Sequence, residues 1–491
     1  MIRSEVAKHR MQQSVGAAGG AKQLLGPTVF TAAACLLLLL VIGCAKPQRD
    51  VAAVNSILRD GVIPTTLPAD NTLTLRQALV LANSYSDSLN LQGEQLVLAA
   101  VQRRRAVAAF LPTVGLNPEY SVREATGNSS GTADANLDVP VDADLVVFDG
   151  MQNVNGYWRD TYLVDREKFR LLDVQEQILL DAGLAYFAVL RAEAQVRVLE
   201  GSVAAQEERL RDARGRARAG LARPLDVSQT EAQVAETKVR LIEAKRAVVD
   251  ARSLLAFLVN APVSGMQLVD EPNLVLPAND EETLLALAAK YRSELRASER
   301  GIDAARRDVK VATGQYYPSL AVRFSTFLYR ETAPSERDWE GLLSVSFPIF
   351  AAGRIEADVR EAWSFLRQAM LVDSQSRRRV WREVRQTLVN LTARQEQLRE
   401  VEVGFTAAQQ ALKQAEASYI AGLGTNLERV SAQDAQLQAE LARVTAKIDI
   451  EALRLSMLQS VGVLREQMID EQGNLSLVAR DAEQPLTKEV N

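Results

Sequence analysis

The positions of the prolines constrain this chain most, because they leave room for very long helices. Long stretches of the sequence contain no proline, among them 141–223, 225–261, 278–317 and 349–484. A proline inside a helix removes a backbone donor and clashes with the preceding turn, so long helices are expected in these stretches. A helix from about residue 151 to residue 219 would be roughly 100 Å long at 1.5 Å per residue. No compact globular domain contains such a helix, so we expect an elongated, mainly helical protein.

The apolar residues of the last proline-free stretch recur at spacings of three and four. The series is Leu388, Leu391, Leu398, Phe405, Ala408, Leu412, Ala415 and Tyr419. Charged residues and glutamines lie between them, which is typical of a coiled-coil seam. We therefore predict long antiparallel coiled-coil helices.

Four other segments alternate apolar and polar residues with a period of two. They are 114–123, 136–147, 319–328 and 339–349. This period predicts strands with one apolar and one polar face, and about ten residues is the length of a tilted membrane strand. The polar, turn-rich connections 124–135 and 329–338 predict two hairpins. Pro118 and Pro140 lie inside two of these segments, where proline argues for an edge or an irregularity.

The sequence repeats itself at a nearly constant offset, which predicts an internal duplication. Leu81 matches Leu287 and Pro112 matches Pro318, and after the strands Phe148 matches Phe350 and Gly220 matches Gly422. Each half reads as helix, strand, turn, strand, long helix, turn, helix. The first repeat spans 72–270, with strands about 113–148 and a long helix pair 151–261. The second spans 271–466, with a helix 281–315, strands about 319–350 and a helix pair 353–464; a polar tail, 467–491, follows.

Four strands are too few to cross a membrane alone. An open sheet in lipid leaves unpaired backbone groups along two edges, each costing several kcal/mol, and the smallest membrane barrels have about eight strands. The chain must therefore share a barrel with copies of itself. Two, three or more copies satisfy this argument equally.

The N-terminus has the pattern of a lipoprotein signal peptide. A basic leader precedes an apolar run from Val29 to Ile42, which is too short to span a bilayer comfortably. Residues 41–44, Val-Ile-Gly-Cys, resemble a bacterial lipobox. We therefore predict a signal peptide over 1–43, a lipidated Cys44, a tether over 44–71, and localisation to the outer membrane of a Gram-negative bacterium. An uncleaved anchor is the alternative, and Met11 is a second candidate start.

Composition excludes most catalytic chemistry. The only histidine is His9, and the only cysteines are Cys35 and Cys44. The rest of the chain therefore lacks a catalytic thiol, a histidine base and the usual zinc ligands, so we expect no enzyme, no metal and no cofactor. With 57 Lys and Arg against 62 Asp and Glu, the net charge of −5 does not favour a nucleic-acid partner.

Several short motifs together resemble those of the TolC-type outer-membrane efflux proteins, in their lipoprotein branch. They are Leu-Thr-Leu-Arg-Gln-Ala-Leu at 73–79, Phe-Leu-Pro-Thr at 110–113, Tyr-Tyr-Pro-Ser at 316–319, Phe-Pro-Ile-Phe at 347–350, Gly-Arg at 353–354, and Ala-Gly-Leu at 219–221 and 421–423. The resemblance covers roughly residues 72–465. It implies a homotrimer with a 12-stranded outer-membrane barrel and a periplasmic tunnel of 12 helices. It also implies a membrane-fusion adaptor and an inner-membrane pump of RND or ABC type as partners.

The function that follows is a passive, gated duct for small molecules or metal ions, fed by the adaptor and pump. Protein export in a type I secretion system is the alternative within transport. A non-conducting coiled-coil scaffold would not need the alternating strands. A carboxylate-dependent glycosidase would need two acids converging in a cleft, which nothing in the sequence predicts.

The two turns between long helices are the first candidate site. Adaptor contacts are expected at Gly220, Leu221, Leu225, Gly422, Leu423 and Leu427, although two ordinary α-hairpin turns would have the same pattern. The resemblance assigns pore gating to Tyr419, Glu428 and Ser431. The family has an acid where this chain has Ser431, so only Glu428 keeps the acidic ring. Packing of Tyr419 on the seam and solvation of Glu428 are the simpler alternatives.

The polar faces of the strands are the second candidate site. Glu119, Asp138, Asp142, Asp144 and Arg323 are expected to line the barrel lumen. They would either tune selectivity, as charged rings do in channels, or simply keep the lumen wet.

Overall fold

A computed structural model describes residues 71–123, 134–263, 265–269, 274–331 and 338–469. Every described residue belongs to one unit of the chain, 58–491. The predicted signal peptide 1–43, lipidated Cys44 and nearly all of the tether 44–71 lie outside the described residues, as does most of the tail 467–491.

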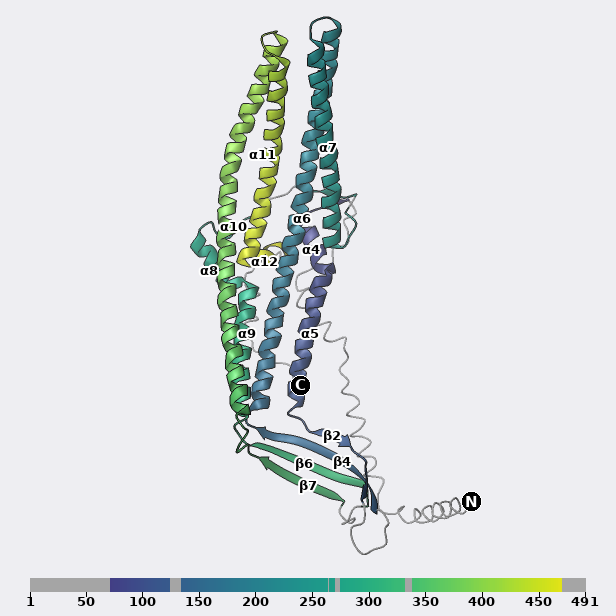
Figure 1. The fold of residues 1–491 in the computed structure, drawn as a ribbon, viewed down its shortest axis with the longest axis vertical. Coiled ribbons are helices and arrows are strands. Elements are labelled where there is room, and N and C mark those ends of the chain that lie inside the picture. Colours follow the sequence, from purple (N-terminus) through teal and green to yellow (C-terminus); the bar gives the residue numbers. More distant parts are fainter. Residues whose placement is uncertain (1–70, 124–133, 264, 270–273, 332–337, 470–491) are drawn as a thin grey trace, which may run out of the picture. The chain divides into compact units, whose positions relative to one another are not determined.

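Four long helices form two α-hairpins (Figure 1). Their bounds are Gln152–Arg218 (α6), Pro224–Val259 (α7), Arg354–Ile420 (α10) and Asn426–Val461 (α11). α6 and α10 each have 67 residues, and α7 and α11 each have 36. The fold is therefore mainly helical, as predicted, and equal helix lengths in the two halves agree with an internal duplication.

Two shorter helices precede the strands in each repeat, where the sequence pattern suggested one. They are Leu75–Tyr85 (α4), Asp87–Ala108 (α5), Glu281–Tyr291 (α8) and Ser293–Gly314 (α9). The helix predicted over 281–315 is divided at Arg292, which is extended at φ −64° and ψ 113°. Ser86 divides the first helix at ψ 119°, and its hydroxyl accepts a hydrogen bond from the Leu89 N–H at 3.3 Å. One extended residue barely disturbs the apolar periodicity, so the pattern runs through both breaks.

The largest core lies where the short helices pack against the long ones. Tyr186 of α6, Leu284 of α8 and Leu455 of α11 are all fully buried there. A pair of very short parallel strands, Thr72–Leu73 (β1) and Gln267–Leu268 (β5), joins this core. The Tyr186 hydroxyl lies 2.8 Å from the Leu73 carbonyl oxygen and 2.7 Å from that of Val269, so it ties both strands to α6.

The remaining strands form one antiparallel sheet, where α6 and α10 begin (Figure 1). Their bounds are Thr113–Leu116 (β2), Glu119–Arg123 (β3), Asp134–Asp149 (β4), Ser319–Arg330 (β6) and Trp339–Ser346 (β7). The order is β2-β4-β6-β7, with β3 also paired to β4. Both predicted hairpins form, and β4 pairs with β6 to join the two repeats.

Two details of the strands differ from the sequence pattern. The strand predicted over 114–123 is interrupted at Asn117 and Pro118, because proline has no N–H for the ladder. Pro140 stays within β4 but lies at a shift of the register. The strand predicted to end at residue 349 stops at Ser346, before Pro348.

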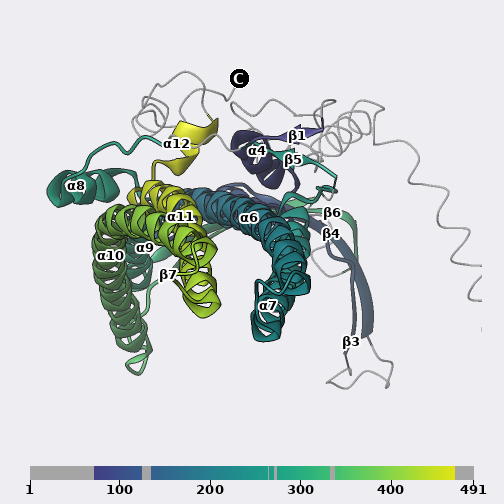
Figure 2. The same cartoon turned by 90° about the horizontal axis from the view of Figure 1, so that it is seen from above.

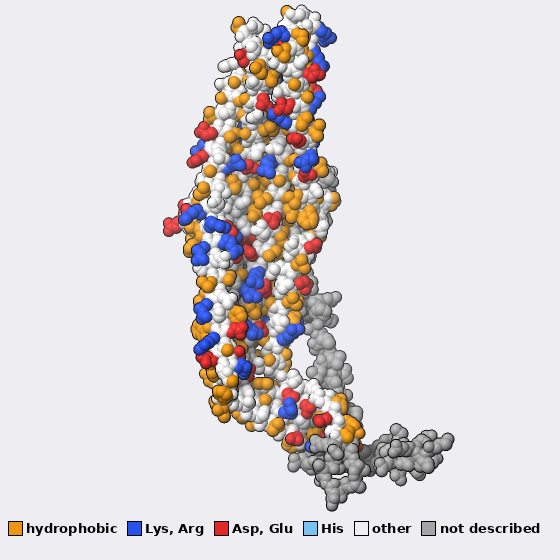
Figure 3. All heavy atoms as spheres, in the orientation of Figure 1, with side chains coloured by type: hydrophobic (Ala, Val, Ile, Leu, Met, Phe, Trp, Pro, Cys, Tyr) orange, Lys and Arg blue, Asp and Glu red, His pale blue; other side chains and the backbone are white. Residues whose placement is uncertain are grey.

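The short elements lie together on one side of the long helices (Figure 2). This side carries α4, α8, the β1–β5 pair and a last helix, Leu464–Ile469 (α12), which enters the predicted tail 467–491. Lys and Arg side chains are interspersed with Asp and Glu along the helices on the face seen in Figure 3. Among the described helices, none combines the length and apolar character needed to cross a membrane.

Candidate functional site

The turn of each α-hairpin is built around a glycine of left-handed conformation. Gly220 has φ +75° and Gly422 has φ +74°, and a Cβ added at either would meet no atom within 4 Å beyond its immediate chain surroundings. The requirement for glycine is therefore conformational, because left-handed backbone is costly for residues with a Cβ. After the turn, α7 starts with Pro224, whose missing N–H costs nothing at the first helical position.

The second hairpin starts its return helix with a capping box formed by Thr425 and Glu428. The Glu428 N–H donates to Thr425 Oγ1 at 3.2 Å, and the Thr425 N–H donates to Glu428 Oε2 at 3.0 Å. Each side chain thus satisfies a backbone donor at the start of α11. Glu428, predicted as a gating acid, therefore has a local role in the structure that the sequence analysis did not foresee.

The predicted contact leucines all project from the turns. Leu221, Leu225, Leu423 and Leu427 are exposed, with Leu423 at 87%. Water-exposed leucines at an exposed turn are available for contact with another protein. No described residue covers them in the isolated chain.

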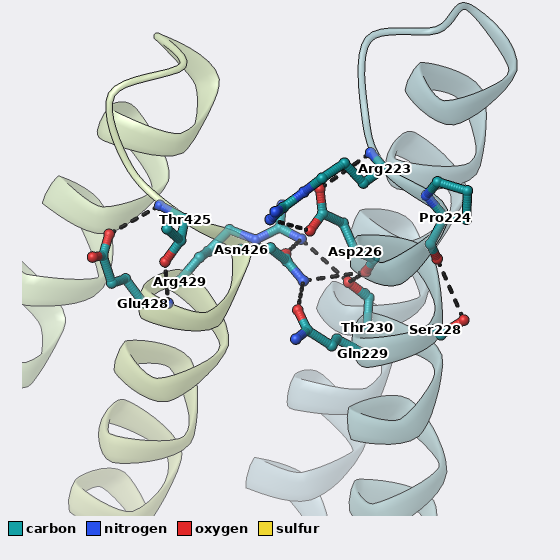
Figure 4. Close-up of polar contacts among 10 residues, drawn as sticks. All are labelled: Arg223, Pro224, Asp226, Ser228, Gln229, Thr230, Thr425, Asn426, Glu428 and Arg429. Carbon is teal, nitrogen blue, oxygen red and sulfur yellow. Dashed lines mark hydrogen bonds and ion pairs between the residues drawn. The ribbon is translucent and has the colours of Figure 1, made fainter.

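A polar cluster, which we call the inter-hairpin link, connects the two hairpins just below the turns (Figure 4). Asn426 of α11, only 1% exposed, donates from Nδ2 to the Asp226 carbonyl oxygen and to Gln229 Oε1 of α7, each at 3.1 Å. Arg429 donates to Asn426 Oδ1 at 2.7 Å and to Thr230 Oγ1 at 3.4 Å. The link is defined by these five residues.

Arg429 also contacts the predicted gating tyrosine. Its guanidinium carbon lies 4.3 Å from the centroid of the Tyr419 ring, a cation–π distance. Burial lowers the pKa of the Arg429 guanidinium, and its Nε has no hydrogen-bond partner in the described part of the chain. Tyr419 therefore packs beside the link, whereas Ser431 is exposed and lies outside it.

Sequence reasoning missed the residues of the link. One signal was present: Asn426 stands where the other repeat has Pro224, at the same offset that matches Gly220 to Gly422. A buried amide that replaces a proline at a helix start has donors that need partners. The signal was therefore a position at which the two repeats differ, Pro224 in one and Asn426 in the other.

The second candidate site is the polar face of the sheet. The pairings Glu119–Asp138 and Asp144–Arg323, with Asp142 two residues before Asp144, place all five predicted lumen residues on one face. Arg323 Nε donates to Asp144 Oδ1 at 2.6 Å. Ser325 and Asn117 donate to the two oxygens of Asp142, at 2.6 Å and 2.9 Å.

The opposite face of the sheet is apolar. Leu343 and Val345 of β7 are 64% and 67% exposed, and Trp339 stacks on Phe324 with ring centroids 5.9 Å apart. Exposed apolar residues on a whole sheet face indicate contact with lipid or protein rather than water. The face polarity predicted from the period-two pattern is thus present in the sheet.

Comparison with known proteins agrees with this architecture. Residues 87–261 and 284–463 match the family described as outer membrane efflux protein. The chain is 24% identical over 437 residues to the outer membrane efflux protein BepC of Brucella suis biovar 1 (strain 1330), across 85% of this chain and 91% of BepC.

Solved structures show the same fold. The outer membrane protein VceC from Vibrio cholerae aligns with a TM-score of 0.70 and 19% identity, covering 79% of this chain and 96% of VceC. A membrane protein from Pseudomonas aeruginosa aligns with a TM-score of 0.72 and 16% identity, covering 82% of this chain and 99% of that protein. The matched ranges 87–261 and 284–463 lie one within each predicted repeat, 72–270 and 271–466.

Proposed function

Because the chain belongs to the outer membrane efflux protein family, we propose that it is the outer-membrane duct of a tripartite efflux system. In this proposal three copies close a 12-stranded barrel, and their helices form a 12-helix tunnel into the periplasm. Small molecules or metal ions pass through passively, and the energy comes from an inner-membrane pump of RND or ABC type. Acylation of Cys44 would anchor each copy to the outer membrane.

The open antiparallel sheet carries this proposal. Its outer strands are β2 and β3 on one side and β7 on the other, and neither edge has a partner strand among the described residues. Such edges cannot face lipid, because each unsatisfied backbone group costs several kcal/mol there. Joining edge to edge with other copies satisfies them, and it turns the face with Asp142, Asp144 and Arg323 toward one shared interior.

The hairpin turns are the proposed docking and gating end. Exposed leucines at 221, 225, 423 and 427 suit an adaptor that contacts the turns. The inter-hairpin link holds α11 against α7, so the entrance widens only if these hydrogen bonds break. Tyr419 supports the link through Arg429, and three copies of Glu428 near the axis would favour cations.

Paired cysteine substitutions on β7 test the arrangement of the sheet. Once residues 1–43 are removed and Cys44 is acylated, the mature chain would have no free thiol, so Ser344→Cys and Val345→Cys each introduce a single label site. In planar bilayers, a membrane-impermeant charged thiol reagent should change the current through Ser344→Cys and leave Val345→Cys unaffected. Neighbouring residues on one strand make these variants closely matched.

The mass of the same protein in detergent tests the copy number. Native mass spectrometry should give the mass of three acylated chains. A monomer that never conducts would overturn the proposal. A current that changes through Val345→Cys but not through Ser344→Cys would reverse the assignment of the faces.

A further inference from the structure

A positively charged hollow lies between α6, α9 and α10, away from the hairpin turns. It has a volume of about 440 Å³. Its polar and aromatic lining consists of Tyr162, Asp303, Arg306, Arg307, Lys310 and Trp363. We call it the junction pocket.

The junction pocket is close to the sheet. Tyr162 is ten residues into α6, which begins at Gln152, and Trp363 is nine residues into α10, which begins at Arg354. At 1.5 Å per residue both lie about 15 Å from the start of their helix. Side chains lean toward the N-terminus of their own helix. The side chains of α6 and α10 therefore lean toward the sheet, whereas those of the antiparallel α9 lean away from it. The two groups of side chains converge on the pocket.

Trp363, which lines the pocket, lies on the flank of α10 that faces α8. Trp363 and Arg385 are 22 residues apart on α10, close to six helical turns, so they project from the same flank. Arg385 donates to Glu281 of α8 at 2.7 Å. Figure 2 shows α8 on the side opposite to the one toward which the ends of α7 and α10 curve.

The cations of the pocket keep unused hydrogen-bond donors. Arg306 pairs with Asp303 at 3.0 Å, and Asp303 is shared with Arg300 at 3.2 Å. Lys310 is exposed and has neither a hydrogen bond nor an ion pair with any described residue. The lining therefore carries three cationic side chains and one carboxylate, and this excess of positive charge attracts an anion.

Arg307 lies between two aromatic rings. Its guanidinium carbon is 5.7 Å from the centroid of Trp158 and 5.9 Å from that of Tyr162, and Nη1 donates to Asn155 Oδ1 at 3.2 Å. The rings orient the guanidinium, and the bond to Asn155 is the one hydrogen bond it makes to a described residue, so most of its five N–H donors are available to a ligand.

We propose that the junction pocket binds the phosphate of an anionic phospholipid of the membrane leaflet next to it. The inference rests on the proposed function, in which the sheet crosses the outer membrane. Arg307, Arg306 and Lys310 would donate to the phosphate oxygens, a group that arginine recognises in a planar, bidentate way. Trp363 and Trp158, both partly exposed, are amphipathic rings of the kind that collect at membrane interfaces.

Lipid retention by the full-length protein tests the proposal. Delipidated protein in a neutral detergent would be titrated with phosphatidylglycerol or with phosphatidylcholine of the same acyl chains, and bound lipid counted by native mass spectrometry. Phosphatidylglycerol should be retained preferentially. Arg306→Gln with Lys310→Gln should weaken its binding roughly 25-fold, at about fivefold for each charge lost near a membrane surface.

A matched variant separates the pocket from bulk charge. Arg399→Gln with Lys413→Gln removes the same two residue types from exposed positions on α10, away from the pocket, and should retain phosphatidylglycerol like the parent. Equal losses in the two double variants, or equal retention of both lipids by the parent, would overturn the proposal. Inorganic phosphate that competes as well as phosphatidylglycerol would instead assign the pocket to free phosphate and also overturn it.

Bilayer currents from the same preparation keep the two proposals distinguishable. A preparation that conducts but shows no headgroup preference overturns the lipid site alone. One that prefers phosphatidylglycerol through Arg306 and Lys310 but never conducts supports the site and counts against the duct.

Discussion

Removing the Asn426 side chain should open the proposed duct. Asn426→Ala deletes two hydrogen bonds to α7, both at 3.1 Å, and the 2.7 Å bond that orients Arg429. A neutral hydrogen bond contributes about 1 kcal/mol net and one to a charged group about 1.5–3 kcal/mol. Of the three bonds that Asn426→Ala deletes, only the two to α7 directly oppose separation of the hairpins, so we assign roughly 2 kcal/mol to their loss. This corresponds to about a 30-fold change, per subunit, in the equilibrium constant between joined and separated hairpins.

Single-channel recording measures this shift. Currents through Asn426→Ala in planar bilayers should show a longer open time than the parent at the same voltage. Gln229→Ala removes one of the two hydrogen bonds that Asn426 makes to α7 and should give an intermediate open time. The series tests whether the open time follows the number of hydrogen bonds that Asn426 makes to α7.

Thr425→Ala is the matched control. Thr425 is adjacent to Asn426, and its side chain caps α11 by bonding within the same turn, to the Glu428 N–H. Loss of such a cap costs about 1 kcal/mol of helix stability, so the control weakens α11 without removing a bond of the link. If Thr425→Ala lengthened the open time as much as Asn426→Ala, or if neither variant lengthened it, the reasoning would be refuted.

Three further predictions concern the core. Burial raises the pKa of Glu176 to about 8, so the folded chain holds a proton that the unfolded chain releases above its ordinary value of 4.5. The contribution of this group to stability is thus greatest at low pH and falls as the pH rises through 4.5 toward about 8, and thermal unfolding of Glu176→Gln should lose that dependence. Gly183→Ala should lower the unfolding temperature, because its Cβ would collide with Leu455 Cδ2, whereas Gly201→Ala, with open space around it, should not. Tyr186→Phe removes the hydroxyl beside the Leu73 and Val269 carbonyls and should increase amide exchange in β1 and β5 at a stability cost of about 1–3 kcal/mol, and unchanged exchange there would contradict it.

The long helices could be predicted from the sequence because their ends carry strong signals. Proline and glycine define the turn at Gly220–Pro224, and the period-two pattern assigned the polar and apolar faces of the strands. The breaks at Ser86 and Arg292 could not be predicted in this way, since a single extended residue leaves the apolar periodicity almost unchanged and its conformation also depends on contacts that the pattern does not contain. Arg292, for example, is held by a 2.6 Å hydrogen bond from Nη1 to the Gln459 carbonyl oxygen of α11.

The inter-hairpin link could not be predicted from local sequence patterns either. The partners of Asn426 lie about two hundred residues away in the sequence, and periodicity carries no information on which polar residue is buried. The same holds for the junction pocket, whose rings and cations come from three helices. Sequence periodicity therefore predicted elements and faces, while the specific contacts between elements needed the structure.

The link can be tested by replacing Asn426 with the proline that stands at the matching position of the other repeat. Pro224 and Asn426 occupy the same first position of α7 and α11, and the residue before each is extended, with ψ of 150° at Arg223 and 155° at Thr425. Extended backbone is what a following proline requires, and proline is well tolerated at the first helical position. Asn426→Pro should therefore keep the start of α11 intact while it removes every hydrogen bond of the Asn426 side chain. We expect unchanged helix content by circular dichroism together with an open time close to that of Asn426→Ala; a Pro variant with normal helices and parental currents would show that the link does not hold the entrance closed.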